Sequence, residues 1–280
     1  MIQIHSRQNS LRRHPVASYF ALTFAISWLG ALVVAAPSLM RGESTSKTTG
    51  LIIFPAMLLG PSLAGIILTR IVDGASGFRD LLARMSRARV PISWYAVLLV
   101  PPALILTVLF CLKAFLSARF TPNVFALGVL FGCITGFFEE IGWMGYAFPK
   151  MIRTHSALTA SLLLGLLWCV WHLPAINYLG AATPHGTYWF RYFLAFTAAM
   201  IPIRVLICWI YVNTNSVFLA QMMHASSTGS LVVFSPGALT PRDETMWYAF
   251  YAVALWISVA IVLRSSGARI TLLSGVSARP

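Results

Sequence analysis

The sequence predicts an all-α integral membrane protein, a polytopic bundle of about eight transmembrane helices with one cytoplasmic interfacial amphipathic helix. Hydrophobic residues make up 58% of the 280 positions, and charged residues only 10%. A soluble domain of this length has too small an interior to bury that much apolar surface. The apolar runs are also continuous and do not alternate with polar residues. Helices satisfy their own backbone hydrogen bonds in hydrocarbon, so we expect these runs to span the membrane as helices.

Eight apolar segments are long enough to cross the membrane, and no repeat or linker divides them, so residues 1–280 are expected to form a single integral membrane domain. The segments are Val16–Ala36, Leu51–Ile71, Trp94–Leu116, Val124–Phe148, Ala157–Leu173, Tyr188–Tyr211, Val217–Phe234 and Thr245–Leu263. The first is longer than the roughly 7–15 apolar residues of a signal peptide, so we expect an uncleaved span. Pro174 predicts a kink or stop after the fifth span. Asn215 or Ser216 is expected to cap the seventh.

The 20 lysines and arginines outnumber the seven acidic residues, which gives a net charge of +13. The basic residues lie at the ends of apolar runs, and no basic cluster alternates with aromatic residues, so no nucleic-acid partner is expected. Most of them lie in the N-terminal tail, the 70–89 connection, the 150–153 loop and the C-terminal tail. By the positive-inside rule we expect these segments, and both termini, in the cytoplasm beside anionic lipid.

The connection between the second and third spans predicts a helix that lies on the membrane surface. In the segment GFRDLLARMSRARV, the apolar residues recur at i, i+3, i+4 and i+7, which places them on one helical face. These residues are Phe78, Leu81, Leu82 and Met85. The arginines are expected on the other side, and they are Arg79, Arg84, Arg87 and Arg89. This pattern is typical of an interfacial helix on the cytoplasmic leaflet.

Two acidic residues and two histidines lie inside the expected spans. Glu139 and Glu140 lie in the fourth span, His172 near the end of the fifth and His224 in the seventh. Burying such groups in lipid costs roughly 3 kcal/mol or more, so they usually mark a functional cavity. Adjacent helix positions differ by about 100°, so one glutamate is expected to face the cavity while the other needs a separate partner. Glu139 and His224 lie at similar depths, whereas His172 lies deeper unless its span begins outside the hydrocarbon.

One carboxylate and two imidazoles suit two chemistries. Glu139 could act as the general base on a water, with His172 and His224 binding that water, stabilising an oxyanion or protonating a leaving amine. Alternatively, Glu139, His172 and His224 could bind a catalytic divalent metal such as zinc with an open fourth position. The HExxH motif that commonly accompanies such a zinc site is not present in the sequence.

The motifs around these residues resemble those of the CPBP intramembrane proteases, which comprise type II CAAX prenyl endopeptidases and bacteriocin-processing or immunity-associated membrane proteins. The carriers of the resemblance are EEIGWMGY from Glu139, the Trp168-x-x-x-His172 spacing, and His224 with Thr228. These motifs lie at residues 137–148, 166–174 and 216–228. The wider resemblance to the family covers about residues 51–263. The resemblance implies a multi-pass protein of the prokaryotic plasma membrane.

By this resemblance, Glu139 would activate the water and His172 would position it. His224 would contribute to the oxyanion site or bind a metal. The family includes enzymes described as metalloproteases and as metal-free glutamate proteases, so the resemblance implies either a bound divalent metal or no metal. The implied partners are membrane lipid and a membrane-associated peptide or protein substrate.

Three positions depart from the family pattern. The family arginine, four residues after the second glutamate, is Met144 here, so Glu140 lacks that counter-charge and is expected either to be protonated or to pair with another arginine such as Arg204. The family asparagine or aspartate four residues after the last histidine is Thr228, which has one donor in place of an amide's two. The aromatic residue of the second motif is Trp168 in place of phenylalanine.

Three functions follow from these observations. The leading one is an intramembrane endopeptidase that hydrolyses a peptide bond with a glutamate-activated water. The second is a weak or inactive homologue that acts as a membrane scaffold or immunity factor, because Met144 and Thr228 replace family residues. The third is a transporter with a proton relay, for which the sequence offers no inverted repeat or pair of broken helices.

Overall fold

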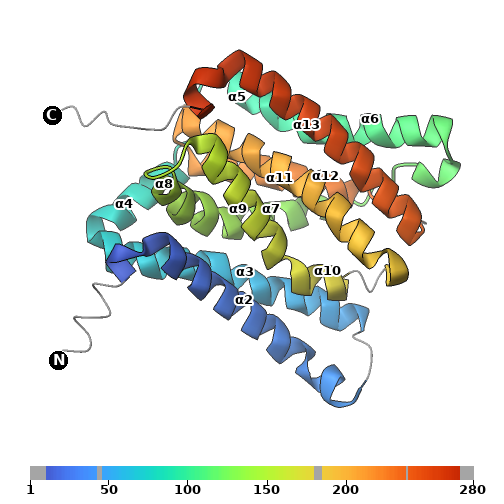
Figure 1. Ribbon diagram of the computed structural model, residues 1–280, viewed down its shortest axis with the longest axis horizontal. Helices are drawn as coiled ribbons and strands as arrows, with labels where there is room; N and C mark the ends of the chain where they lie inside the picture. Colours follow the sequence, from blue (N-terminus) through green and yellow to red (C-terminus); the bar gives the residue numbers. More distant parts are fainter. Residues whose placement is uncertain (1–10, 43–45, 180–184, 238, 272–280) are drawn as a thin grey trace.

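The computed structural model describes residues 11–42, 46–179, 185–237 and 239–271, which form a bundle of α-helices without a β-strand among them (Figure 1). The helices are α2 (Pro15–Met40), α3 (Lys47–Leu68), α4 (Gly74–Met85), α5 (Ser93–Ala96), α6 (Val100–Phe115), α7 (Leu127–Gly142), α8 (Phe148–Met151), α9 (Ala157–Trp171), α10 (Leu173–Leu179), α11 (Trp189–Thr214), α12 (Val217–Val233) and α13 (Pro241–Thr271). Two π-helical segments, Thr69–Asp73 and Trp143–Ala147, follow α3 and α7. The predicted all-helical membrane fold is confirmed.

Each of the eight expected spans corresponds to a helix, but the helices differ in length. Among the described residues, six helical stretches are long and apolar enough to cross a membrane. They are Pro15–Met40, Ile52–Met85, Ser93–Phe115, Leu127–Met151, Gly186–Thr214 and Pro241–Ser265. The other two, α9 and α12, have 15 and 17 residues. A helix of 15 residues rises about 23 Å, less than the roughly 30 Å of hydrocarbon.

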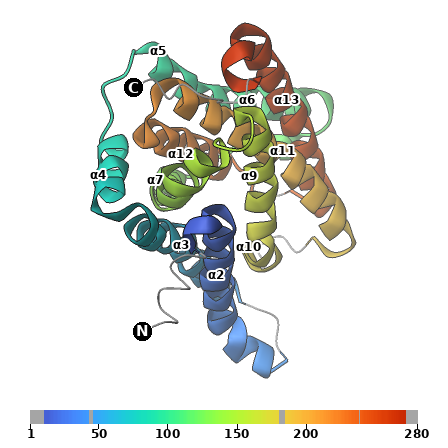
Figure 2. The same cartoon turned by 60° about the vertical axis from the view of Figure 1, so that its left-hand side comes forward.

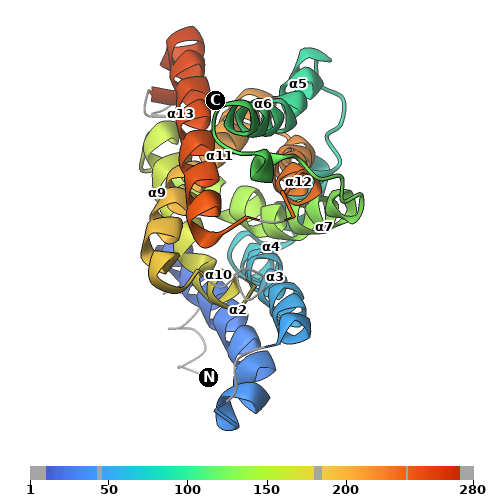
Figure 3. The ribbon, with the colours of Figure 1, turned by 90° about the vertical axis from the view of Figure 1, so that its right-hand side faces the viewer.

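The short helices lie in the middle of the bundle, although α9 leaves Leu163 and Leu166 exposed. Helix α12 packs most extensively against α7, and α9 packs against α11. Figures 2 and 3 show α2 and α3 on one side of these helices and α6 and α13 on the other. Large apolar side chains on the outer helices, such as Val33, Leu99, Phe115 and Ile257, are exposed, as lipid-facing residues are. The start of α2 and the end of α13 lie at the same end of the bundle (Figure 1).

Small residues allow α7 and α12 to approach closely. Three glycines of α7, spaced four apart, face α12, and they are Gly128, Gly132 and Gly136. A Cβ atom on Gly136 would lie 2.5 Å from the carbonyl oxygen of Gln221, and one on Gly132 would clash with that of Ala225. Such stripes of small residues are typical of close helix pairs in membranes. The packing therefore sets the distance between the two helices that carry Glu139 and His224.

The α9 helix ends as expected, and a hydrogen-bonded chain fixes its end. Its last residue is Trp171, His172 caps it, and α10 begins before Pro174. The indole of Trp171 donates to Ser27 Oγ at 2.7 Å, and that hydroxyl donates to the carbonyl of Met57 at 2.7 Å. These bonds tie the His172 end of α9 to α2 and α3.

Two smaller expectations can be checked in the helix ends. Ser216 caps α12, because its hydroxyl accepts a hydrogen bond from the backbone N–H of Leu219 at 3.0 Å. The amphipathic segment forms α4 as predicted, but one residue differs from the prediction. Arg84 was expected on the outer, polar face and is instead buried, with 6% of its surface exposed.

Proline chemistry explains why Arg84 turns inward. Pro149 has no N–H, so it cannot donate to the carbonyl of Gly145 four residues earlier. Arg84 Nη2 donates to that carbonyl at 3.0 Å, and Nη1 donates to the hydroxyl of Tyr211 at 2.9 Å. Arg84 therefore joins α4 to the π-helical segment after α7 and to the end of α11.

Candidate active site

The carboxylate of Glu139 lies in the last turn of α7, and 1% of the residue's surface is exposed. Its Oε2 accepts hydrogen bonds from two indoles, Trp168 Nε1 at 2.6 Å and Trp143 Nε1 at 3.1 Å. Trp143 is four residues further along the chain, on the same side of the helix, whereas Trp168 comes from α9. These bonds fix the carboxylate and leave Oε1 facing His224 Nε2 at 3.9 Å.

The neighbouring carboxylate of Glu140 is fully buried and has different partners. Arg204 Nη1, from α11, donates to both of its oxygens at 2.7 and 2.8 Å. Nδ1 of His224 lies 2.6 Å from Oε1 of the same carboxylate. Glu140 thus has a partner of its own in Arg204, as expected for one of the two glutamates, while His224 from α12 lies between both carboxylates.

Arg204 supplies the positive charge that Met144 lacks, as predicted. Met144 is buried, and its sulfur lies 3.8 Å from the thiol of Cys208, one turn of α11 after Arg204. The counter-charge to Glu140 thus comes from α11 rather than from α7. Of the Arg204 guanidinium, Nε and Nη2 have no hydrogen-bond partner among the described residues.

His172 lies beside this cluster and reaches it through Trp168. Its Nδ1 bonds to the backbone carbonyl of Trp168 at 2.8 Å, which makes Nδ1 the donor and leaves Nε2 with a free lone pair. The rings of Trp168, Trp171 and Phe196 surround the imidazole, with centroids 4.8 to 5.5 Å away. The Trp168 ring also lies 5.3 Å from the ring of His224. Trp168 therefore contacts three of the four predicted catalytic residues, Glu139, His172 and His224.

The predicted metal site can be tested on these side chains. Among the described residues, no group of three His, Cys, Asp or Glu side chains has the arrangement of a metal site. Glu139 and His224 approach one another, but His172 contacts aromatic rings and a backbone carbonyl. The residues in this arrangement do not fit a three-ligand zinc site.

Several contributing residues were not predicted from the sequence. The indoles of Trp143 and Trp168 were missed as donors to Glu139, although the i, i+4 spacing of Trp143 was a usable signal.

Thr228, at the position of the family amide, is half-buried and makes no side-chain hydrogen bond to another described residue. It lies one turn after His224 on α12.

The fold and the site together define a multi-pass helical membrane protein with a buried carboxylate and imidazole cluster. Residues 121–229, which contain α7, α9, α11 and most of α12, match the model of a family described as Rce1-like, type II CAAX prenyl endopeptidase. A similar curated protein is CAAX prenyl protease 2 of Methanococcus maripaludis, which is 33% identical over 112 residues. These are 39% of this chain and 39% of that relative. Over this segment the chain is similar to the type II CAAX prenyl endopeptidases, which confirms there the resemblance seen in the motifs.

Proposed function

We propose that the protein is an intramembrane endopeptidase in which Glu139 activates a water to hydrolyse a peptide bond. The observation that carries the proposal is the fixed orientation of the Glu139 carboxylate, whose Oε2 is held by two indoles while Oε1 faces His224. Because the two indoles hold one carboxylate oxygen, the lone pairs of the other oxygen keep a constant direction, as a general base requires. The match of residues 121–229 to the Rce1-like family model supports the same chemistry.

The reaction can be written with the side chains of this chain. The water oxygen attacks the peptide carbonyl carbon while its proton passes to Glu139 Oε1. The carbonyl oxygen becomes an oxyanion, which needs nearby hydrogen-bond donors. As the tetrahedral intermediate collapses, the C–N bond breaks and the proton on Glu139 passes to the leaving amine. The free Nε2 of His172 suits an acceptor that orients the water.

His224 has its orientation set by Glu140. With Nδ1 bonded to Glu140 Oε1 at 2.6 Å, Nε2 is the nitrogen directed at Glu139 and the reacting groups. A carboxylate behind a catalytic imidazole fixes both its direction and its tautomer. Arg204 in turn holds Glu140 in place. We therefore propose that His224 stabilises the oxyanion or protonates the leaving amine. Glu140 and Arg204 would hold the His224 imidazole in position.

The substrate is proposed to be a peptide attached to the membrane by an apolar part. An apolar groove of about 390 Å³ runs along α7 and α12, the helices that carry Glu139 and His224, and is lined in part by Phe137 and Phe138 of α7 and Phe218 and Met222 of α12. The relative's name, a CAAX prenyl protease, makes a peptide with a prenylated C-terminal cysteine the first substrate to test. A leader peptide is the second.

The test is cleavage by the purified protein in liposomes that contain quenched fluorescent peptides of both types. Glu139→Gln and His224→Ala are each expected to lower the rate by about 10²–10⁴-fold, as loss of a general acid or base does. Asp243→Asn, which removes a carboxylate at the start of α13, serves as the control and should cleave at the normal rate. Cleavage at an unchanged rate by both site variants would end this assignment.

The second candidate function is a membrane scaffold or immunity factor without catalysis, which Thr228 favours because it makes no side-chain hydrogen bond within the described part of the site. A scaffold needs the shape of the cluster but not its base. In cells, Glu139→Gln at normal protein levels should then preserve the phenotype. Loss of the phenotype with the protein intact in the membrane would rule the scaffold out.

A further inference from the structure

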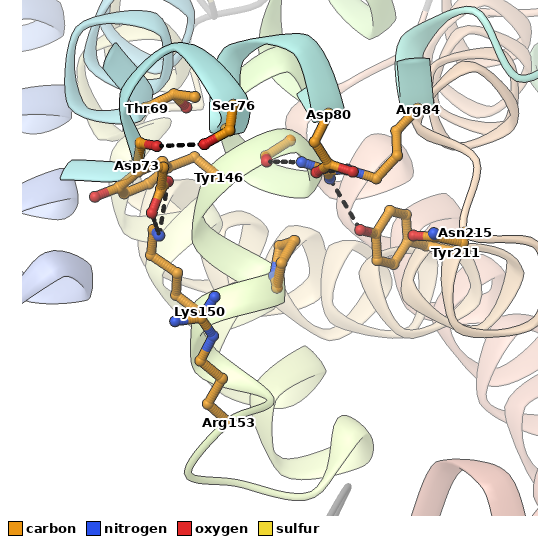
Figure 4. A pocket seen from close by; sticks show the side chains of 13 residues that line it. Thr69, Asp73, Ser76, Asp80, Arg84, Tyr146, Lys150, Arg153, Tyr211 and Asn215 are labelled. Atoms are coloured by element: carbon orange, nitrogen blue, oxygen red, sulfur yellow. Dashed lines mark hydrogen bonds and ion pairs between the residues drawn. The ribbon is translucent and has the colours of Figure 1, made fainter. Parts of the chain in front are cut away.

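A polar cavity lies outside the candidate active site, at the end of the bundle where α2 begins. It has a volume of about 380 Å³ and lies between α4, the π-helical segments that follow α3 and α7, and the end of α11 (Figure 4). By the distribution of basic residues, this is the end expected to face the cytoplasm. The proposed proteolytic mechanism uses none of the side chains that line the cavity.

Two buried hydroxyl groups at this cavity lack partners. Thr69 and Tyr146 line it, and they are 3% and 1% exposed. Neither Thr69 Oγ1 nor the Tyr146 hydroxyl has a hydrogen-bond partner among the described residues. A buried polar group without a partner costs about 1–3 kcal/mol, so two at one cavity indicate that something else bonds to them.

Among the described residues, the charges that line the cavity leave one cation, Arg153, without an ion-pair partner. Lys150 Nζ binds both oxygens of Asp73, at 2.7 and 2.9 Å, and Arg84 Nε binds Asp80 Oδ2 at 2.8 Å. Both carboxylates are therefore occupied and neutralised. Arg153 is exposed, and its guanidinium has no hydrogen-bond or ion-pair partner in the described part of the chain. Figure 4 shows it one turn beyond Lys150, on the same side of the cavity.

We propose that this cavity binds a phosphate group that carries one negative charge, with Arg153 as the ion-pair partner and the hydroxyls of Thr69 and Tyr146 as donors. A phosphate has several acceptor oxygens and no need of a protein carboxylate, which matches what the cavity leaves open. A phospholipid headgroup can supply it, because basic cavities between transmembrane helices on the cytoplasmic side bind such headgroups. Inorganic phosphate has the same chemistry and is the second source.

The test is native mass spectrometry of the intact protein, titrated with phosphatidylglycerol or with diacylglycerol, which has the same chains without the phosphate. Phosphatidylglycerol is expected to bind and diacylglycerol is not. Arg153→Met should weaken the binding roughly fivefold, the effect of one basic side chain near anionic lipid. Arg79→Met removes the same charge from the exposed face of α4, outside the cavity, and should change the affinity less than twofold.

A second pair of variants tests the hydroxyls separately from the charge. Tyr146→Phe should weaken binding roughly tenfold, because it removes a hydrogen bond to a charged group. Tyr251→Phe removes another buried hydroxyl without a partner in the described structure, far from the cavity in the chain, and should have no effect. If inorganic phosphate binds with the same variant profile while the lipid does not, the site holds free phosphate. Equal losses in Arg153→Met and Arg79→Met, or full binding by Tyr146→Phe, would overturn the proposal.

Discussion

Arg204 on α11 donates hydrogen bonds to both carboxylate oxygens of Glu140 on α7, at 2.7 and 2.8 Å. Both side chains are fully buried. The guanidinium also lies over the ring of Trp168, 4.3 Å from its centroid, so it contacts the group that holds Glu139. An arginine from a different helix has thus taken the place that the family pattern gives to position 144.

This pair predicts a rescue by a second substitution. Arg204→Met leaves the Glu140 charge buried without its cation, which should destabilise the fold by about 3–5 kcal/mol. Met144→Arg places an arginine one turn after Glu140, and in Arg204→Met/Met144→Arg it should restore much of the lost stability. Thermal unfolding in detergent measures both changes.

Arg191→Met is the matched control, because it removes an exposed arginine from the same helix. It should unfold at nearly the same temperature as the unmodified protein. An Arg204→Met variant as stable as Arg191→Met would show that the buried ion pair does not hold α7 and α11 together.

The hydrogen bond from the Trp168 indole to Glu139 predicts a loss of catalysis that the size of the ring alone would not cause. Trp168→Phe keeps an aromatic ring but removes the 2.6 Å hydrogen bond to Glu139. Because hydrogen bonds to charged groups contribute about 1.5–3 kcal/mol, peptide cleavage should fall roughly tenfold or more. Trp247→Phe is the control, since that buried indole has no partner among the described residues. Equal cleavage by the two variants would contradict the role of Trp168.

The glycines of α7 predict that the two site helices tolerate no added bulk. Gly132→Ala inserts a Cβ against the backbone of Ala225 and Gly229, so α7 and α12 must separate. Overpacking of this kind costs about 1–3 kcal/mol, and cleavage should fall with it. Gly237→Ala meets nothing within 4 Å and should be neutral. Unfolding temperature and cleavage rate, measured on both variants, check the prediction, and a neutral Gly132→Ala would refute it.

Ser27 predicts a purely structural effect at the His172 end of α9. Ser27→Ala leaves the Trp171 indole buried without its acceptor, which should cost about 1–3 kcal/mol of stability. Ser258→Ala is the control, since its hydroxyl bonds only to a carbonyl of its own helix. Thermal unfolding that shows no difference between the variants would mean that this chain of bonds does not anchor α9.

Much of the fold follows from the sequence because the bilayer allows few alternatives. Each long apolar run forms a helix, since lipid offers the backbone no other partner. The stop after His172 and the cap at Ser216 follow from local chemistry, and so they were predictable. Helical periodicity also located α4, because its pattern depends only on spacing along the chain.

The inward turn of Arg84 and the two indoles on Glu139 depend on contacts between helices, and the sequence pattern does not encode them. Arg84 belongs to the polar face of an isolated helix, and its bonds to the carbonyl of Gly145 and the hydroxyl of Tyr211 draw it inward. The pairing of Arg204 with Glu140 was predictable because a buried carboxylate next to Met144 requires a cation, and few lie inside the spans. The position of His172 among the rings of Trp168, Trp171 and Phe196 depends on how α9 packs.

The most direct test of the account is a double-mutant cycle in cleavage rate between Glu139 and His224. Both side chains are proposed to act on one reacting water and its substrate. When residues act as a unit, removing the second costs little more than removing the first. Glu139→Gln/His224→Ala should therefore be no slower than the slower of the two single variants. A double variant whose loss is the product of the two single losses would show that the residues act independently, and it would contradict a shared catalytic site.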